Sequence, residues 1–457
     1  MATRKRTPNP NLARLLDQAG WTRTQLAQQV NRLGPQAGLE LTYDRTAVAH
    51  WIAGTAPRPQ VRALIVEAFS ARLGRPVTHA EAGLRPAVPP GPADGRGDTG
   101  DAVEELIDLG RATMDPSRRG VLAASVFSAA LTLPAFTATA HAAPRPEAEW
   151  RPGQRTTRIG ASQVWSVRTM TERIADILDE LGAAHAMPMA SAFLVNTVGP
   201  WLRAQAGDQV RKDMLAAASD LAYLTGWMAM YEKAHGLGQK YYVRALGLAQ
   251  EAGDQVTYCR TLRGMSLQAS NLGHGHKALE LADSAAEAAP SAGPRLLAFL
   301  RGQQAHAAAM VGDRRRAHAR LREAEDALSR ADSRREAIGG YDRTAWLFHV
   351  AHVLNEERDL AGSIRVLQQS IRHQPAQERQ GRAHAYAVLA RRQVALGHLD
   401  AACHSWGRFL DEYEHVSSAR ADDHFGTLRA AVRQHAKSRP VEELAERARE
   451  IGALKAA

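Results

Sequence analysis

The sequence predicts an all-α protein with a small N-terminal domain, a flexible linker and a C-terminal array of paired helices. Alanine and arginine dominate the composition, aromatic residues make up only 5%, and no alternating β-branched run indicates strands. A proline- and glycine-rich stretch interrupts the helical patterns after residue 85. The length of 457 residues suits roughly two to four domains. We place them at residues 1–85, 86–160 and 161–457.

Five short helices are expected in the first domain. Each has a capping residue, a terminating glycine or an apolar face at helical spacing. Their expected extents are Asn11–Gly20, Thr22 or Thr24 to Val30, Asp44–Gly54, Val61–Gly74 and a short helix from Thr78, where Glu81 completes a capping box. A connector from about Asn31 to Thr42 separates the second helix from the third.

The third of these helices has two different faces. Val48, Trp51 and Ile52 form an apolar stripe that would pack on the preceding helix. Arg45, Thr46, Ala49 and His50 fall on the other face, where they could meet base edges. Gly54 ends the helix, and Pro57 and Pro59 are expected to prevent it from resuming.

Five helices with the third presented outward resemble the phage-repressor, or XRE, type of helix-turn-helix domain. The matching residues are Gln25-Leu26-Ala27, Val48, Trp51, Gly54 and Pro59. The resemblance implies double-stranded DNA as the partner and a DNA-contacting set of Gln25, Tyr43, Arg45, Thr46, His50 and Arg58. In it Gln25 and Arg58 would touch the phosphate backbone, and Arg45, Thr46 and His50 would face the groove.

Two features of this segment allow other interpretations. The connector of about twelve residues departs from the usual turn of three or four, so the third helix could sit at an unusual angle. His50 could also be an ordinary surface histidine, and Arg45 could pair locally with Asp44 or Glu40. A helical adaptor is the alternative to a DNA reader for the whole domain.

The charge distribution favours DNA binding. Residues 1–85 hold twelve Lys and Arg against five Asp and Glu, which is +7 of the net +10 of the chain. Positive charge is therefore concentrated where phosphates would be neutralised. Arg4-Lys5-Arg6 could form a flexible arm along the DNA backbone or a solvated tail.

The region between the two domains contains a segment that resembles an export signal. After the linker Arg85–Gly100 and a short helix at Asp101–Met114, the stretch Ser117–Leu122 looks like a twin-arginine motif. Residues 120–143 are uncharged but rich in Ala, Ser and Thr, and a membrane-spanning helix needs about twenty strongly apolar residues. We expect a linker or a docked segment, with a single membrane span as the alternative.

A recurring pattern of small residues characterises the chain from about Ser162 onward. A turn is followed five and twelve residues later by small residues, as in Gly273, Ala278 and Ala285. Turns are expected at about 233, 273, 312, 358 and 397. The pattern resembles the tetratricopeptide repeat, although the spacing exceeds its usual 34 residues. A generic all-α bundle is the alternative.

A solenoid of this kind presents a concave face built from the first helix of each pair. The candidates on that face are Trp227, Arg263, Asn271, His306, His352, Asn355 and Arg391. Arginine and asparagine there suit a peptide backbone or an acidic ligand, but each residue could simply face water. We interpret the histidine pairs His274/His276 and His349/His352 as non-metal, because neither has a third ligand nearby in sequence.

No catalytic motif stands out, so we expect neither an enzyme nor a cofactor. The two cysteines, Cys259 and Cys403, lie far apart in helical patterns, which favours a reducing cytoplasm.

The whole chain resembles actinobacterial (Streptomyces-type) XRE-family regulators with a C-terminal tetratricopeptide domain, related to negative regulators of differentiation and antibiotic production. The strongest marks are YDRTAVAHWIAGTAPRP, GRPVTHAEAGL and LTGWMAM…YYVRALGLAQEAGD. The resemblance implies a cytoplasmic, homodimeric transcription regulator. Its array would bind an unknown peptide, small molecule or protein. A scaffold with a weak or nonspecific DNA-binding module and a membrane-anchored sensor are the alternatives.

Overall fold

The computed structural model describes residues 8–34, 39–73, 77–79, 81–84, 99–115, 127–129, 131, 133, 136, 158–289, 293–331, 341–435 and 438–456. Within these residues the regular structure is helical, and the β-type pairing is limited to an isolated bridge between Arg158 and Gln205. The all-α prediction is therefore confirmed. The basic segment Arg4-Lys5-Arg6 and the twin-arginine segment 117–120 lie outside the described residues.

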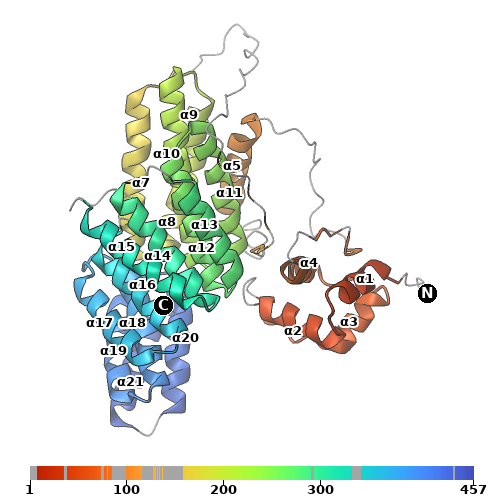
Figure 1. Cartoon of the computed structure of the whole chain (residues 1–457), viewed down its shortest axis with the longest axis vertical. Helices are drawn as coiled ribbons and strands as arrows, with labels where there is room; N and C mark the ends of the chain where they lie inside the picture. The colour runs from red at the N-terminus through yellow and green to blue at the C-terminus, as the bar shows by residue number, and fades with distance from the viewer. Residues whose placement is uncertain are drawn as a thin grey trace.

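The described helices form two units that are separated in space (Figure 1). The N-terminal unit contains α1 (Pro10–Gln18), α2 (Arg23–Leu33), α3 (Arg45–Ile52) and α4 (Pro59–Leu73). The C-terminal unit contains α5 (Thr99–Met114), α7 (Ala161–Leu181), α8 (Ala183–Phe193), the π-helical η2 (Leu194–Val198), α9 (Gly199–Arg203), α10 (Asp208–Tyr231), α11 (His235–Ala252), α12 (Gln255–Asn271), α13 (Gly275–Glu287), α14 (Pro294–Met310), α15 (Arg314–Ser329), α16 (Arg343–Glu356), α17 (Leu360–His373), α18 (Arg379–Ala395), α19 (Leu399–Tyr413), α20 (Ala419–Gln434) and α21 (Arg439–Ala456).

Capping residues define the first three helices of the N-terminal unit. The Asn9 side chain accepts a hydrogen bond from Leu12 N at the start of α1. Thr22 forms a capping box with Gln25 at the start of α2, so Thr22 is the cap rather than Thr24. Asp44 accepts from Thr46 N and Ala47 N at the start of α3. These side chains satisfy backbone donors that have no partner within the helix.

Two expected boundaries in this unit are wrong. α4 begins at Pro59 rather than Val61, because proline stops a preceding helix but also fits the first turn of a new one. The short helix expected from Thr78 is a single turn among the described residues: Glu81 N donates to Thr78 Oγ1 (3.0 Å), and Gly83 (φ +63°) ends it. The unit therefore consists of four helices and a turn in its described part.

Helix α5 lies in the stretch expected as a linker, but it packs in the core of the C-terminal unit. Its residues Val103, Leu106 and Ile107 are buried there. The Thr113 hydroxyl is 2.9 Å from the Tyr241 hydroxyl of α11. The C-terminal unit therefore begins structurally before residue 161.

Successive helices of the C-terminal unit form pairs, α10 with α11 through α18 with α19, as Figure 1 shows. Each pair turns at a residue in the left-handed region, which closes the first helix and reverses the chain. These residues are Lys233 (φ +56°), Gly273 (φ +78°), Gly312 (φ +84°), Arg358 (φ +70°) and Gly397 (φ +77°). They are the five turn positions that the sequence pattern predicts.

The small residues predicted in the second helix of each pair are buried. Ala278, Ala285, Ala317 and Ala324 are all 0% exposed. Side chains of this size let neighbouring helices approach closely, because a larger one would push their backbones apart. Gly226 of α10 shows how close the approach is, since a Cβ added there would lie 2.8 Å from the Tyr242 ring.

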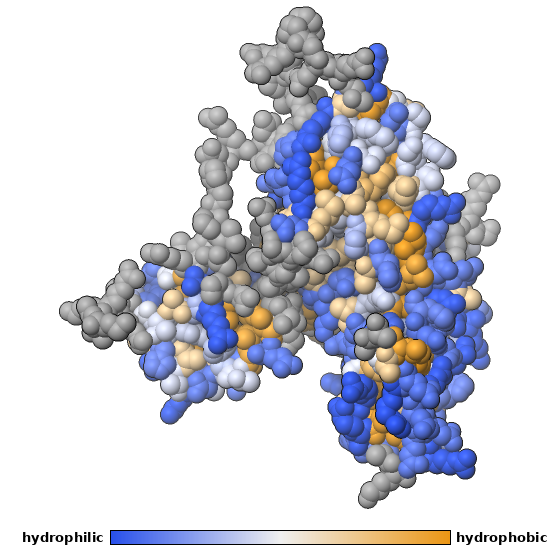
Figure 2. Space-filling model, turned by 180° about the vertical axis from the view of Figure 1, so that it is seen from behind, coloured by the Kyte–Doolittle hydropathy of each residue, from blue (hydrophilic) through white to orange (hydrophobic). Residues whose placement is uncertain are grey.

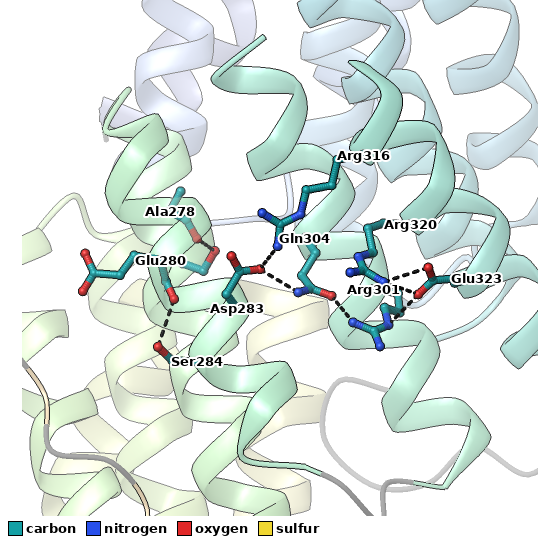
Figure 3. Close-up of polar contacts among 10 residues, drawn as sticks. Ala278, Glu280, Asp283, Ser284, Arg301, Gln304, Arg316, Arg320 and Glu323 are labelled. Carbon is teal, nitrogen blue, oxygen red and sulfur yellow. Dashed lines mark hydrogen bonds and ion pairs between the residues drawn. The ribbon is translucent and has the colours of Figure 1, made fainter. Parts of the chain in front are cut away.

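Polar contacts connect the consecutive helices α13, α14 and α15 (Figure 3). Asp283 accepts from Gln304 Nε2 (2.7 Å) and Arg316 Nη2 (2.5 Å). Arg301 Nε lies 2.9 Å from Glu323, which also pairs with Arg320. Because these groups are partly exposed, they orient the helices more than they stabilise them. Figure 2 shows the molecule from behind, where hydrophilic residues cover much of the lower C-terminal unit and leave narrow apolar strips between them.

The two ends of the C-terminal unit meet. Ser417, just before α20, donates its N–H to Leu181 O (2.8 Å) and accepts from Ala184 N (3.0 Å), at the turn between α7 and α8. Lys233 Nζ lies 2.8 Å from Asp423 of α20. The array therefore closes on itself, and its inward-facing first helices surround a common interior.

Candidate functional site

The outer face of α3 is the first candidate site. Arg45, Thr46 and His50 are all exposed, whereas Val48 and Trp51 on the opposite face are buried in the N-terminal core. The helix therefore presents the side chains that the sequence assigns to its outer face. The Asp44 side chain caps the helix by accepting from Thr46 N and Ala47 N.

Two reciprocal hydrogen bonds, which form a clasp between Asn31 and Tyr43, fix the orientation of α3. Asn31 near the end of α2 donates Nδ2–H to Tyr43 O and accepts from Tyr43 N, both at 2.8 Å. The Tyr43 ring meets the Trp51 ring edge-on, with centroids 5.0 Å apart. The half-buried Leu39 and Leu41 attach the described end of the long connector to the core. Tyr43 thus positions α3 more than it offers a free side chain.

The two residues expected at the phosphate backbone are exposed beside α3. Gln25 Oε1 accepts a hydrogen bond from Thr22 N (2.8 Å). The Nε2 group of the same amide is a hydrogen-bond donor, as a contact with phosphate requires. Arg58 is exposed immediately before α4. The six predicted residues therefore belong to one small unit, with four of them in or directly before α3 and α4.

The second candidate site is a cavity of about 240 Å³ inside the C-terminal unit. It is lined mainly by α10, α12, α14, α16 and α18, the first helices of the pairs, and by the start of α20. A partly open hollow with aromatic and polar lining is a usual form of a small-molecule site.

The structure brings five of the seven predicted groove residues to this cavity: Trp227, Arg263, Asn271, His306 and His352. Asn355 and Arg391 do not line it. The Asn355 amide lies beside Glu356 (3.4 Å). Arg391 is exposed, yet close enough to help lower the pKa of His384 and His424.

Two guanidinium groups in the cavity wall lie against aromatic rings. Arg263 is 6% exposed, and its Cζ is 4.1 Å from the Phe299 ring centroid and 5.9 Å from that of Trp227. Arg420 Cζ is 5.0 Å from the Tyr231 centroid. Within the described part of the chain, no ion pair joins either guanidinium to a carboxylate, and Arg263 Nε is buried without a hydrogen-bond partner.

A chain of histidines runs along the same interior. The His306 and His352 rings have centroids 4.7 Å apart, and His384 Nδ1 is 3.0 Å from His424 Nε2. Burial lowers the pKa of His306 to about 4 and that of His424 to about 3, with nearby arginines adding to the shift. These rings are therefore neutral at neutral pH. Among the described residues, no group of three or more His, Cys, Asp or Glu has the arrangement of a metal site.

The sequence analysis missed Tyr231, Arg420 and His384 as cavity residues. Arg420 comes from α20, outside the five repeats, so no repeat register pointed to it. Tyr231 follows Trp227 by one helical turn on α10, and this spacing could have identified it as a neighbour on the same helix face.

A segment between the two units lies along the C-terminal unit in its described residues. The Phe127 ring stacks on His274 with centroids 5.6 Å apart, and Gln239 exchanges two hydrogen bonds with the Ser128 backbone (2.8 and 2.9 Å). Ala129 N donates to the Glu67 carboxylate of α4 (2.8 Å). This segment therefore contacts both units.

Residues 127–129, 131, 133 and 136 of the apolar segment 120–143 are not helical, and the rest of that segment lies outside the described residues. Across the described residues, every helix falls short of the combined length and hydrophobicity needed to cross a membrane.

Comparison with known proteins gives a match for the N-terminal unit. Residues 12–85 match the family model described as the SP15 N-terminal domain. No curated protein matches the chain. The matched range coincides with α1–α4 and the turn that follows them.

Proposed function

We propose that this protein is a sequence-specific DNA-binding transcription regulator of the XRE helix-turn-helix type, and not an enzyme. The observation that carries the proposal is the exposed face of α3, with Arg45, Thr46 and His50 presented together. Arginine and threonine in the first turn of the helix and histidine in the next suit base edges in the major groove. The clasp between Asn31 and Tyr43 supports the proposal because base reading requires a rigidly oriented helix.

The charge of the N-terminal unit supports phosphate binding. Residues 1–85 carry +7, and in this proposal Gln25 and Arg58 contact the backbone on either side of the groove. The C-terminal unit acts as a tetratricopeptide-like solenoid that holds an effector and assembles a cytoplasmic homodimer. Effector binding would alter the spacing of the two DNA readers.

The proposal is tested by fluorescence anisotropy of the full-length protein with a labelled duplex that carries the motif selected from random DNA, at physiological salt. Arg45→Ala combined with His50→Ala is expected to weaken binding at least tenfold. The matched control is Arg372→Ala with His373→Ala, which removes the same side-chain types from an exposed end of α17. Absence of binding by the wild type, or equal binding by both double variants, would refute DNA recognition through α3.

A further inference from the structure

We propose that the cavity of the C-terminal unit binds a small molecule that combines an anionic group with a flat apolar body. The inference rests on the proposed function in one respect, since it assigns a chemical class to the effector. The carrying observation is that Arg263 and Arg420 bring two positive charges into an aromatic interior, and no carboxylate of the described residues forms an ion pair with either.

Arg263 is the main anchor for the anion. It is 6% exposed, and its Nε has no hydrogen-bond partner in the described structure. Burial lowers its pKa, and tyrosine hydroxyls, led by Tyr223 and Tyr341, oppose that shift. A buried guanidinium charge without a paired carboxylate is costly for the fold, so a ligand that brings an oxyanion to the guanidinium would recover part of that cost.

The two acidic residues at the cavity each have a hydrogen-bond partner other than the arginines. Asp342 caps α16 by accepting from Ala345 N (3.0 Å). Glu378 precedes α18 and lies 3.4 Å from Gln374 Nε2. Neither contributes to the pKa of Arg420, whose charged neighbour is Asp423, itself paired with Lys233. The guanidinium groups are therefore left to a ligand.

The walls favour a flat and compact molecule. Trp227, Tyr231 and Phe348 supply ring faces around the cavity. The volume of about 240 Å³ holds a small molecule, and Arg420 and Tyr231 both line it. An extended peptide of several residues exceeds this volume.

The test uses three probes of nearly equal shape: 2-naphthoate, 2-naphthamide and 2-naphthylmethylamine. Binding to the full-length protein is measured by calorimetry and tryptophan fluorescence at pH 7.5. The expected result is binding of 2-naphthoate at least tenfold tighter than of the neutral amide, and no detectable binding of the cation. Equal binding of the amide, preference for the cation, or binding of none of the three would overturn the proposal.

Two variants locate the site and control for folding. Arg263→Met preserves length but removes the charge, and it should abolish preference for the anion while raising the melting temperature. Arg365→Met, at an exposed position of α17, should change neither property. Loss of melting temperature with Arg263→Met would show that the arginine serves the fold and would contradict the proposal. DNA binding is measured on the same samples without probe, so that failure of DNA recognition is separated from failure of ligand binding.

Discussion

Arg420 of α20 lies over the ring of Tyr231 of α10, with 5.0 Å between its guanidinium carbon and the ring centroid. Tyr231 ends the first helix of the paired array, and Arg420 begins the helix that follows its last pair. This contact joins the two ends of the array and forms part of the cavity wall. The shape of the candidate ligand site therefore depends on closure of the whole unit.

Gly182 allows that closure, because its φ of +95° directs the chain past Ser417. Gly182→Ala would strain the backbone and place a Cβ against the Ser417 backbone. We expect a loss of stability on the order of 2 kcal/mol in urea unfolding. Gly247→Ala, a helical position with open space around it, is the control and should be neutral or gain roughly 0.5–1 kcal/mol. Equal effects of the two variants would show that closure does not depend on Gly182.

The backbone conformation of the turn residue Arg358 is expected to lower the free energy of unfolding. It is exposed and left-handed at φ +70°, a conformation that costs a residue with a Cβ roughly 1–2 kcal/mol. Arg358→Gly should therefore raise the unfolding free energy by about 1 kcal/mol, measured by urea titration. Gly397→Ala, at the equivalent turn of the last pair, should lower it by a similar amount. Destabilisation by Arg358→Gly would indicate that the arginine side chain has a compensating role.

The turn spacing explains how far the sequence could predict the cavity. Trp227, His306 and His352 each precede their turn residue by six positions, so they face the same way in successive repeats and converge. Arg391 has the same position in the last repeat but remains exposed. Closure by α20 is a tertiary event that repeat spacing does not encode, and Arg420 was missed for the same reason.

Local rules predicted the N-terminal unit well, because capping is a short-range interaction. Asp44 and the apolar pair Val48 and Trp51 behave as expected from their spacing. Pro59 was misjudged because one residue type can stop one helix and start another. The contact between Glu67 and Ala129 has no local signal, since it joins residues of two separate segments.

The buried histidines predict acid sensitivity. Burial lowers the pKa of His306 from its ordinary 6.5 to about 4, so the unfolded chain binds the proton more readily. His306 should contribute roughly 3 kcal/mol to the free energy of unfolding above pH 6.5. This contribution should fall as the pH decreases toward 4. His306→Phe keeps a ring beside His352 and should make the pH dependence of urea unfolding less steep. An unchanged profile would contradict the buried neutral state.

Docking of the segment around Ala129 on α4 should weaken as the pH rises, whereas the stability from the buried histidines is lost as the pH falls. Burial raises the pKa of Glu67 to about 7, whereas the undocked carboxyl would titrate near its ordinary 4.5. The protonated form therefore favours docking, and docking weakens as the pH rises from 4.5 through 7. Glu67→Gln can still accept from Ala129 N and should remove this dependence.

Hydrogen–deuterium exchange of the peptide that contains Ala129, corrected for intrinsic rates, measures this docking. Protection in the wild type should fall between pH 6 and pH 8, while Glu67→Gln stays protected at both. Glu40→Gln, an exposed position of the same unit, is the control and should follow the wild type. Parallel loss of protection in all three proteins would exclude Glu67 as the titrating group.

The most direct test of the central claim is selection of random duplex DNA by the full-length protein at physiological salt, followed by sequencing. The proposal predicts a shared motif in the recovered pool, with palindromic half-sites about one helical turn apart, as a dimer requires. A recovered pool without any shared motif, or no recovered DNA, would contradict a sequence-specific regulator and leave the C-terminal unit as the functional part of the chain.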